Sequence, residues 1–286
     1  MGIIALYDTV SIQGFIYNSN RLRDNRGASL LVEDCFQKYL KKAICNVIKE
    51  ESKDESKCCL DWEKNEAADF ICNTNIKCEI IYIGGGNAQV YFESKNLYKS
   101  VNTEFSQLLL CEIPEVTVVS ECVEVNNNDD YGKLVNALFQ KLQVKKMKHR
   151  GMMCTPALSV TRECNYTRKS AVVWDKEDDR WLSEEISKKR ERAKDERDSE
   201  YYAEVEMLAG EEGEQWVATV HIDGNAMGEN INKLLENRDL SEGIKRIRIF
   251  SRAIQKIYTD SYKQMLQKMI LLLETCLLYT SPSPRD

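Results

Sequence analysis

The sequence has 286 residues, of which 43% are hydrophobic and 30% charged, and its formal net charge is −6 at pH 7. This length allows about two domains with sizeable cores, and the acidic balance argues against a generally basic nucleic-acid-binding surface. No run of about eighteen apolar residues occurs, and the start lacks a secretory pattern. We therefore expect no membrane segment and a cytoplasmic protein.

The eleven cysteines are scattered along the chain without a Cys-x-x-Cys pair. Several lie in apolar stretches typical of strands or helices, which indicates reduced structural thiols. Cys154 and Cys164, together with His149, are candidates for a zinc site. We favour the structural interpretation, because a structural zinc site normally has four ligands at recognisable spacing.

The first half of the chain predicts an α+β unit. An apolar strand, Ile3–Tyr7, delivers Asp8 at its end, and apolar residues at helical spacing predict a helix over Ser29–Ile48. Two strands flank Gly84–Asn87, which predicts a hairpin because glycine and asparagine accept positive φ. The order strand, helix, hairpin, helix, strand is that of a ferredoxin-like sheet, the architecture of the polymerase and cyclase palm. The other expected elements are a charged insert at Glu50–Lys57, hairpin strands at Glu79–Ile83 and Ala88–Phe92, a helix at Leu97–Leu110, a strand at Val116–Val125 and a helix at Tyr131–Met147.

A connector is expected after this unit. Met152–Val173 shows little periodicity. Glu184–Glu200 alternates in charge and has no apolar stripe, so it predicts a solvated helix or a flexible segment.

A second unit of the same kind then begins. Trp216–Ile222 predicts a strand that ends in Asp223, and the chain turns through Gly224–Gly228 into a helix. Ser241 is a plausible N-cap for a long following helix. The repeat is visible mainly as a strand followed by an aspartate. We therefore divide the chain into a first palm (1–148), a connector (149–215) and the start of a second palm (216–275).

The last residues, Cys276–Asp286 (CLLYTSPSPRD), match codon for codon the translation of a sequencing adapter. We expect the natural sequence to be cut near Thr275, so that the hairpin of the second palm is not included.

The stretch Val220–Gly228, VHIDGNAMG, allows two interpretations. In one, Asp223 or Asn225 caps backbone amides at a strand-to-helix turn. In the other, Asp223 binds a divalent metal ion while the backbone of Gly224–Gly228 approaches a triphosphate. An EF-hand is excluded, because Met227 and Leu234 occupy ligand positions of that loop.

For the turn Gly84–Asn87 a simple tight hairpin is favoured over a metal site, since Asn87 is a poor magnesium ligand and the turn has no carboxylate. A nucleotide can still lie against the three glycines. Arg21, Arg23 and Arg26 lie near a helix start, where they either pair with phosphates or form an exposed basic loop.

Three stretches carry a resemblance: YDTVSIQGFIYNSNRLRDNRGASLLV, IYIGGGNAQVYF and VATVHIDGNAMGENI. In this order and spacing they resemble palm-domain proteins related to the large polymerase-like subunit of type III CRISPR complexes. The resemblance covers nearly all of residues 1–275. The connector GMMCTPALSVTRECNYTRKSAV is also similar to the segment that joins two palms in stand-alone members.

The resemblance implies that the second palm is catalytic and uses Mg²⁺ or Mn²⁺. Asp223 then corresponds to a catalytic metal ligand. Residues that contact nucleotide are implied at Gly224, Asn225, Met227 and Gly228 in the second palm and at Gly84, Gly85, Gly86 and Asn87 in the first. Because the first hairpin has glycine and asparagine in place of two aspartates, the first palm resembles a degenerate, structural copy, and Asp8 is a relic or a weak ligand.

Three functions remain open at this point. The first is a nucleotidyltransferase or cyclase of antiviral defence that makes a cyclic nucleotide or oligonucleotide from ATP, with CRISPR or other effector subunits as partners. The second is an inactive palm pair that binds nucleotide, RNA or a partner subunit. The third is a protein similar to diguanylate cyclases, which normally carry one palm and a GGDEF turn. An acidic hairpin after Thr275 would favour the enzyme, and a glycine and asparagine turn would favour the binding protein.

Overall fold

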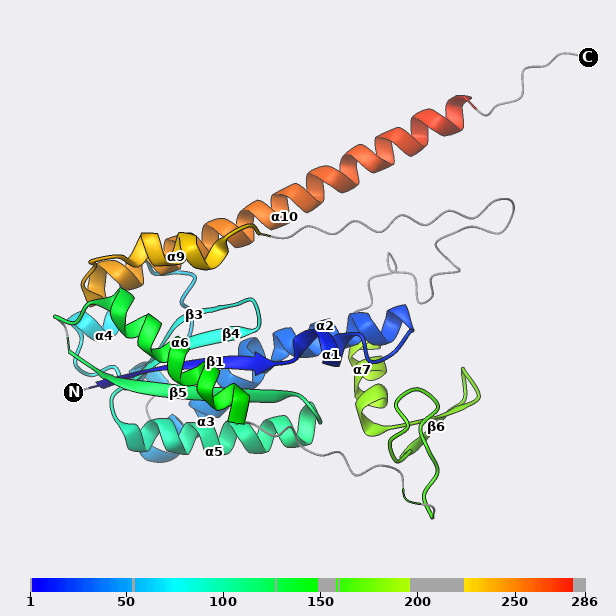
Figure 1. Ribbon diagram of the computed structural model, residues 1–286, viewed down its shortest axis with the longest axis horizontal. Coiled ribbons are helices and arrows are strands. Elements are labelled where there is room, and N and C mark those ends of the chain that lie inside the picture. The colour runs from blue at the N-terminus through cyan, green and yellow to red at the C-terminus, as the bar shows by residue number, and fades with distance from the viewer. Residues whose placement is uncertain are drawn as a thin grey trace, which may run out of the picture.

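The computed structural model describes residues 2–52, 55–126, 128–148, 158, 160–195 and 224–279. In these ranges a five-stranded sheet carries helices on both faces, and a small two-stranded sheet lies apart from it (Figure 1). The α+β class is the one that the sequence predicts. None of the helices described in these ranges is both long and apolar enough to cross a membrane.

The large sheet has the strand order β2-β3-β4-β1-β5. Its central strand β1 pairs antiparallel with β4 and β5, and β3 pairs antiparallel with β4. These four strands reproduce the ferredoxin-like order, and a short β2 is added in parallel at the edge. The bounds are β1 (Gly2–Val10), β2 (Cys58–Cys59), β3 (Cys78–Gly84), β4 (Asn87–Phe92) and β5 (Thr117–Val125).

Both faces of β1 are buried. Ile3, Ala5 and Tyr7 face one core cluster, and Ile4 and Leu6 face the other. A strand that is covered on both faces has a continuous run of apolar residues, so this strand can be recognised in the sequence. The first cluster lies under α1 (Ile12–Ile16), α2 (Leu22–Asp34), the π-helix η1 (Cys35–Leu40), α3 (Lys41–Ser52) and α5 (Lys95–Glu112), with the short 3₁₀ turn η2 (Glu55–Lys57) before β2.

The expected helix over Ser29–Ile48 is longer than predicted. Helix α2 begins at Leu22, and its first turn is held by a hydrogen bond of 2.6 Å from Ser19 to the buried Asp24. The buried residue of this turn, Asp24, is polar. A search for apolar residues at helical spacing therefore places the start of the helix several residues after its true start.

The opposite face of the sheet is covered by helices from distant parts of the chain. The second core cluster joins α4 (Asp69–Cys72), α6 (Tyr131–Lys148), α9 (Met227–Leu235) and α10 (Leu240–Tyr279). Asp239, not Ser241, caps α10, because its carboxylate accepts a hydrogen bond of 2.8 Å from the backbone amide of Glu242. The early turns of α10 pack on the body, and the helix then extends away from it (Figure 1).

One side chain fixes α10 to the sheet. Arg248 is 1% exposed and donates to Glu79 at 2.7 Å and to the backbone oxygens of Ile80 and Ala67 at 2.8 and 2.7 Å. It also donates to the backbone oxygen of Ile81 at 2.9 Å. The pairing of β3 with β4 is irregular at this point, and such a bulge redirects carbonyls out of the ladder, where Arg248 reaches them.

The charged segment of the connector does not form the solvated helix that its sequence predicts. Helix α7 (Glu184–Asp195) buries Ile186, Lys189 and Arg190 against α2. The approach is close: a Cβ on Gly27 would lie 1.8 Å from the backbone oxygen of Lys189. The two-stranded sheet β6 (Val173–Asp175) and β7 (Arg180–Leu182) precedes this helix.

Helix α10 continues through Thr275 to Tyr279. The expectation that Cys276–Asp286 does not belong to the natural protein stays a prediction. The predicted strand Trp216–Ile222 lies outside the described residues.

Candidate functional site

The hairpin between β3 and β4 adopts the tight turn that its glycines predict. Gly85 and Gly86 have φ values of +60° and +78°, which suit the two central positions of a type I′ turn. The backbone amide of Thr9 donates to the oxygen of Gly86 at 3.0 Å, so β1 holds the tip of the turn. A Cβ on Gly86 would lie 2.2 Å from Ile12 Cδ1. The backbone conformation of this position therefore favours glycine, and a side chain there would also displace the end of Ile12.

A pocket of about 630 Å³ surrounds this hairpin. The volume is in the range of small-molecule sites. The pocket collects side chains from four parts of the chain: the helix α2–η1, the hairpin, α6 and the pair α9–α10. Most of its lining is apolar or aromatic, and it consists of Ser29, Val32, Glu33, Phe36, Gln37, Tyr82, Ile83, Gly84, Gly85, Gly86, Asn87, Gln89, Tyr131, Val135, Phe139, Met227, Ile231, Leu235, Ile247, Phe250, Ser251, Ile254 and Gln255.

The helical wall of the pocket is irregular. The π-helix η1 lies between α2 and α3, and two of its residues, Phe36 and Gln37, line the pocket. Single π-helical turns inside α-helices occur frequently at functional sites. This irregularity is an observation independent of the pocket itself.

Apart from the carboxylate of Glu33, the polar side chains of the described lining are neutral. The hydroxyl of Tyr131 donates to the side-chain oxygen of the buried Gln89. Burial raises the pKa of Tyr131 well above its ordinary value, so it remains a donor at neutral pH. Burial, together with the charge of Asp8, also raises the pKa of Tyr82. Among the described lining residues none is lysine or arginine. The pocket suits an aromatic base better than a chain of phosphates.

A metal site at the first hairpin is the alternative that the sequence does not favour, and the contacts of Asp8 bear on it. Asp8 lies beside Asn87 in the register of β1 and β4, as the palm arrangement requires. However, its carboxylate accepts a hydrogen bond of 2.5 Å from the ammonium group of Lys146 on α6. The turn itself contributes no carboxylate. Asp8 is thus neutralised by a lysine, and the described residues at this turn do not form a two-magnesium site.

The predicted residues of the second palm are only partly placed. Asp223 lies outside the described residues, so its roles as catalytic residue and metal ligand stay predictions. Met227 lines the hairpin pocket together with Gly84–Asn87, which brings predicted residues of both palms to one site. Gly224, Asn225 and Gly228 are not part of the described lining. The turn is strained at Ala226, which caps α9 with φ of +53°.

Arg23, one of the three arginines considered for phosphate binding, forms ion pairs with the connector. Arg23 pairs with Glu177 at 3.2 Å and also with Asp175 and Asp178, and its side chain is 15% exposed. It therefore joins α2 to the connector. This contradicts the alternative of an exposed basic loop at this residue.

The zinc alternative at His149, Cys154 and Cys164 is not tested, because His149 and Cys154 lie outside the described residues. No metal-ligating group found within the described residues includes Cys164. The Cys164 sulfur accepts a backbone hydrogen bond of 3.5 Å from Tyr166.

Sequence reasoning missed the contribution of α10 to the pocket. Phe250, Ile254 and Gln255 follow the anchor Arg248 by two to seven residues and line a wall of the pocket. A long apolar helix predicts burial but not which surface it covers. Arg248 stands between Ile247 and Ile249 in the sequence, but Arg246 and Arg252 lie nearby, so the pattern does not single it out.

No family model matches the chain, and no curated protein matches it. Solved structures match part of the chain at low similarity. A chain of the Csm1–Csm4 subcomplex of the type III-A CRISPR–Csm interference complex is 14% identical, with a TM-score of 0.34, over 51% of this chain and 19% of that chain. The Csm1–Csm4 cassette in complex with pppApA is 16% identical, with a TM-score of 0.36. The same cassette in complex with cA4 is 15% identical, with a TM-score of 0.34. Both of these matches cover 51% of this chain and 19% of the other.

Proposed function

We propose that this chain binds a nucleoside triphosphate, ATP in the first instance, and that its first palm is a binding copy without catalytic metal ions. The observation that carries the proposal is the pocket of about 630 Å³ built around Gly84–Asn87. Its aromatic and apolar walls favour a base, and its open glycine turn lets phosphates approach backbone amides. The ion pair between Asp8 and Lys146 supports the absence of metal chemistry there.

In the intact protein, we further propose, the second palm carries out nucleotidyl transfer or cyclisation to make a cyclic nucleotide or oligonucleotide in antiviral defence. The residue proposed for this role is Asp223, with Mg²⁺ or Mn²⁺ and acidic partners beyond Thr275. This proposal rests on the sequence resemblance. Its alternative, an inactive palm pair that binds nucleotide, RNA or an effector subunit, shares the first palm and differs in the second.

The binding proposal is tested by filling the pocket from its glycine turn. A Cβ on Gly84 meets no atom within 4 Å, and Gly84 lines the pocket. Gly84→Leu is therefore expected to project into open space without disturbing the fold and to weaken ATP binding by about 10-fold or more, a loss of at least ~1.4 kcal/mol. Isothermal titration of the purified chain measures this.

Gly14→Leu is the matched control, because Gly14 is exposed on α1 and its Cβ would make only an ordinary contact of 3.7 Å. ATP affinity equal in wild type and Gly84→Leu would refute nucleotide binding in this pocket. Gly228→Leu tests the second palm separately from the pocket of the first palm. A Cβ on Gly228 also meets no atom within 4 Å, but Gly228 lies outside the described lining of the pocket. This variant should weaken triphosphate binding more than nucleoside binding.

A further inference from the structure

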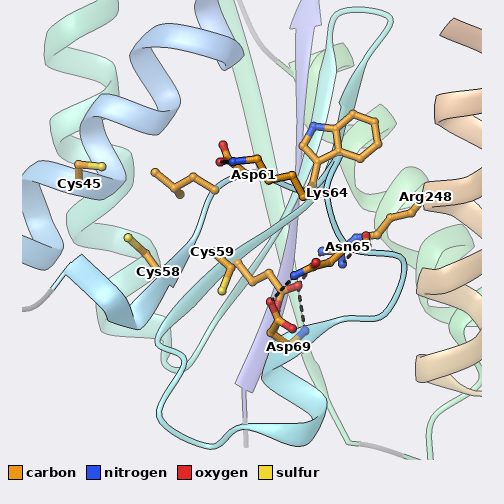
Figure 2. A pocket seen from close by; sticks show the side chains of 11 residues that line it. Cys45, Cys58, Cys59, Asp61, Lys64, Asn65, Asp69 and Arg248 are labelled. Atoms are coloured by element: carbon orange, nitrogen blue, oxygen red, sulfur yellow. Dashed lines mark hydrogen bonds and ion pairs between the residues drawn. The ribbon is translucent and has the colours of Figure 1, made fainter. Parts of the chain in front are cut away.

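A second pocket, of about 440 Å³, lies at the other end of β3. Its lining comprises Cys45, Cys58, Cys59, Leu60, Asp61, Trp62, Lys64, Asn65, Asp69, Glu79 and Arg248 (Figure 2). From Glu79 to Gly84 the strand spans roughly 16 Å at the usual rise per residue, so this pocket is separate from the nucleotide site.

Three metal-ligating side chains converge in this pocket. The Cys59 sulfur and one carboxylate oxygen each of Asp69 and Glu79 lie within 4.8 Å of one another. They come from three segments: Cys59 ends β2, Asp69 begins α4, and Glu79 lies in β3 as the register partner of Cys59. The parallel pairing of β2 with β3 is what places the thiol beside the carboxylate.

The carboxylate of Glu79 is held in a fixed orientation. Its Oε1 accepts from the backbone amide of Asp69 at 3.0 Å and from Arg248 at 2.7 Å, and its Oε2 accepts from the amide of Phe70 at 2.8 Å. Because a carboxylate oxygen accepts two hydrogen bonds, Oε2 keeps one lone pair for a further partner. Such outer contacts are those that orient metal ligands in known sites.

We propose that Cys59, Asp69 and Glu79 bind a zinc ion, with its fourth position open to the pocket for water or a small anion. One sulfur and two carboxylate oxygens suit zinc, because calcium and magnesium take oxygen ligands and copper(I) prefers sulfur. Three protein ligands and an open position are typical of zinc sites that bind an exchangeable ligand.

The size of the site is close to what zinc needs. A tetrahedral zinc ion keeps its ligand atoms about 3.3–3.8 Å apart, given bond lengths of about 2.0–2.3 Å. The three donor atoms, at up to 4.8 Å, therefore have to close in by about 1 Å. Side-chain rotation of Cys59 and Asp69 on their short stems is enough for this.

The charges also fit. The two carboxylates and Arg248 leave one negative charge while the thiol is protonated. When zinc binds and Cys59 releases its proton to solvent, the ion, its three anionic ligands and Arg248 sum to zero.

A second observation points to a ligand in the same pocket. Trp62 lines it and is 2% exposed, yet its indole Nε1 has no hydrogen-bond partner among the described residues. A buried donor without a partner costs about 1–3 kcal/mol. An oxygen ligand on the zinc ion would supply an acceptor in the pocket.

The test uses the purified chain after treatment with a chelator. Titration with Zn²⁺ against a chromophoric competitor is expected to show one ion bound per chain, and Co²⁺ is expected to give a thiolate-to-cobalt charge-transfer band. Cys59→Ser and Asp69→Asn should each lower zinc affinity by about 100-fold and remove or shift this band. Cys72→Ser is the matched control, because Cys72 is exposed on α4 outside the group of three.

A readout in the unaltered chain covers the case in which a variant fails to fold. Zn²⁺ should slow alkylation of Cys59 and leave the rate at Cys72 unchanged, as measured by peptide mass spectrometry. Zinc binding that is absent from the wild type, or equal in wild type and folded Cys59→Ser, overturns the proposal. Alkylation of Cys59 that zinc does not slow overturns it as well.

Discussion

Helix α7 is highly charged yet buried in part, whereas residues 257–268 of helix α10 include apolar side chains that are exposed. Of the twelve residues of α7 nine are charged, yet its Lys189 is fully buried. Residues 257–268 of α10 include apolar and aromatic side chains, yet Ile257 is 60% exposed and Tyr262 48%. Burial therefore follows the partners that the fold supplies, and charge alone does not predict a solvated face.

The partners of α7 explain its burial. Lys189 donates to Glu185 and to the backbone oxygen of Phe15, both at 2.6 Å, and Arg190 donates to Asp24 at 2.8 Å. Each buried charge thus has a counter-charge, without which its burial would be prohibitive. Helix α10 also has a buried ion pair, between Arg248 and Glu79.

The largest effect is expected at that pair. Arg248→Ala leaves Glu79 buried without its cation and removes the anchor of α10, so the free energy of unfolding should fall by about 3–5 kcal/mol. Urea denaturation followed by circular dichroism measures this. Arg252→Ala, one turn later, is the control: Arg252 makes an exposed bond to the oxygen of Glu63 and should cost less than about 1 kcal/mol. Equal costs for the two variants would contradict the anchor.

A smaller loss is expected at the contact between α2 and α7. Gly27→Ala places a Cβ 1.8 Å from the oxygen of Lys189, so the helices must separate, at a cost of about 1–3 kcal/mol. Limited proteolysis should then cut α7 faster than the sheet. Gly14→Ala, on the exposed side of α1, should leave both stability and cleavage unchanged. If Gly27→Ala behaves like this control, α7 does not dock as described.

Acid should weaken the same contact. Burial opposes ionisation of Glu185, but Lys189 and Lys169 outweigh it and lower its pKa below the ordinary 4.5. Burial likewise opposes ionisation of Asp178, and Arg190 and Arg23 outweigh it and lower its pKa below the ordinary 3.8. Their contribution to stability is present above pH 4.5 and is lost as pH falls through the lowered values.

Pepsin cleavage within α7 should therefore appear as pH falls below 4.5, before cleavage of the sheet. Glu185→Gln removes one titrating group and should flatten this pH dependence. A cleavage rate in α7 that does not change with pH over this range, relative to the sheet, would show that the ion pairs do not hold the helix.

The smallest effect is expected at Ile257, on the part of α10 that extends away from the body. Ile257→Ser should change the free energy of unfolding by less than about 0.5 kcal/mol, because the side chain is exposed. Ile244→Ser, at a buried position of the same helix, should cost about 2–5 kcal/mol in the same urea titration. A large loss of unfolding free energy for Ile257→Ser would mean that the part of α10 around Ile257 has a packing partner in the purified protein.

The sequence predicts the sheet and the hairpin well. The run Ile3–Tyr7 and the turn Gly84–Asn87 follow local rules of burial and backbone conformation, and both appear where expected. The N-terminal turn of α2 was missed because its buried residue is Asp24. Local pattern is informative only where burial and hydrophobicity coincide.

The candidate site was predicted only in part. The glycine turn and Met227 are motif residues, and the pocket includes both. The pairing of Asp8 with Lys146 joins residues 138 positions apart, and Arg248 reaches carbonyls that a bulge turns outward. Such contacts depend on tertiary placement, which no spacing in the sequence encodes.

The central claim, nucleotide binding at the hairpin pocket, is tested most directly by photolabelling. A photoreactive ATP analogue is added to the purified chain, and labelled peptides are identified by mass spectrometry with excess ATP as competitor. The account predicts competed labels on β3–β4, on η1 and on the part of α10 that includes Phe250. Labels confined to other elements, or labels that ATP does not compete, would contradict it.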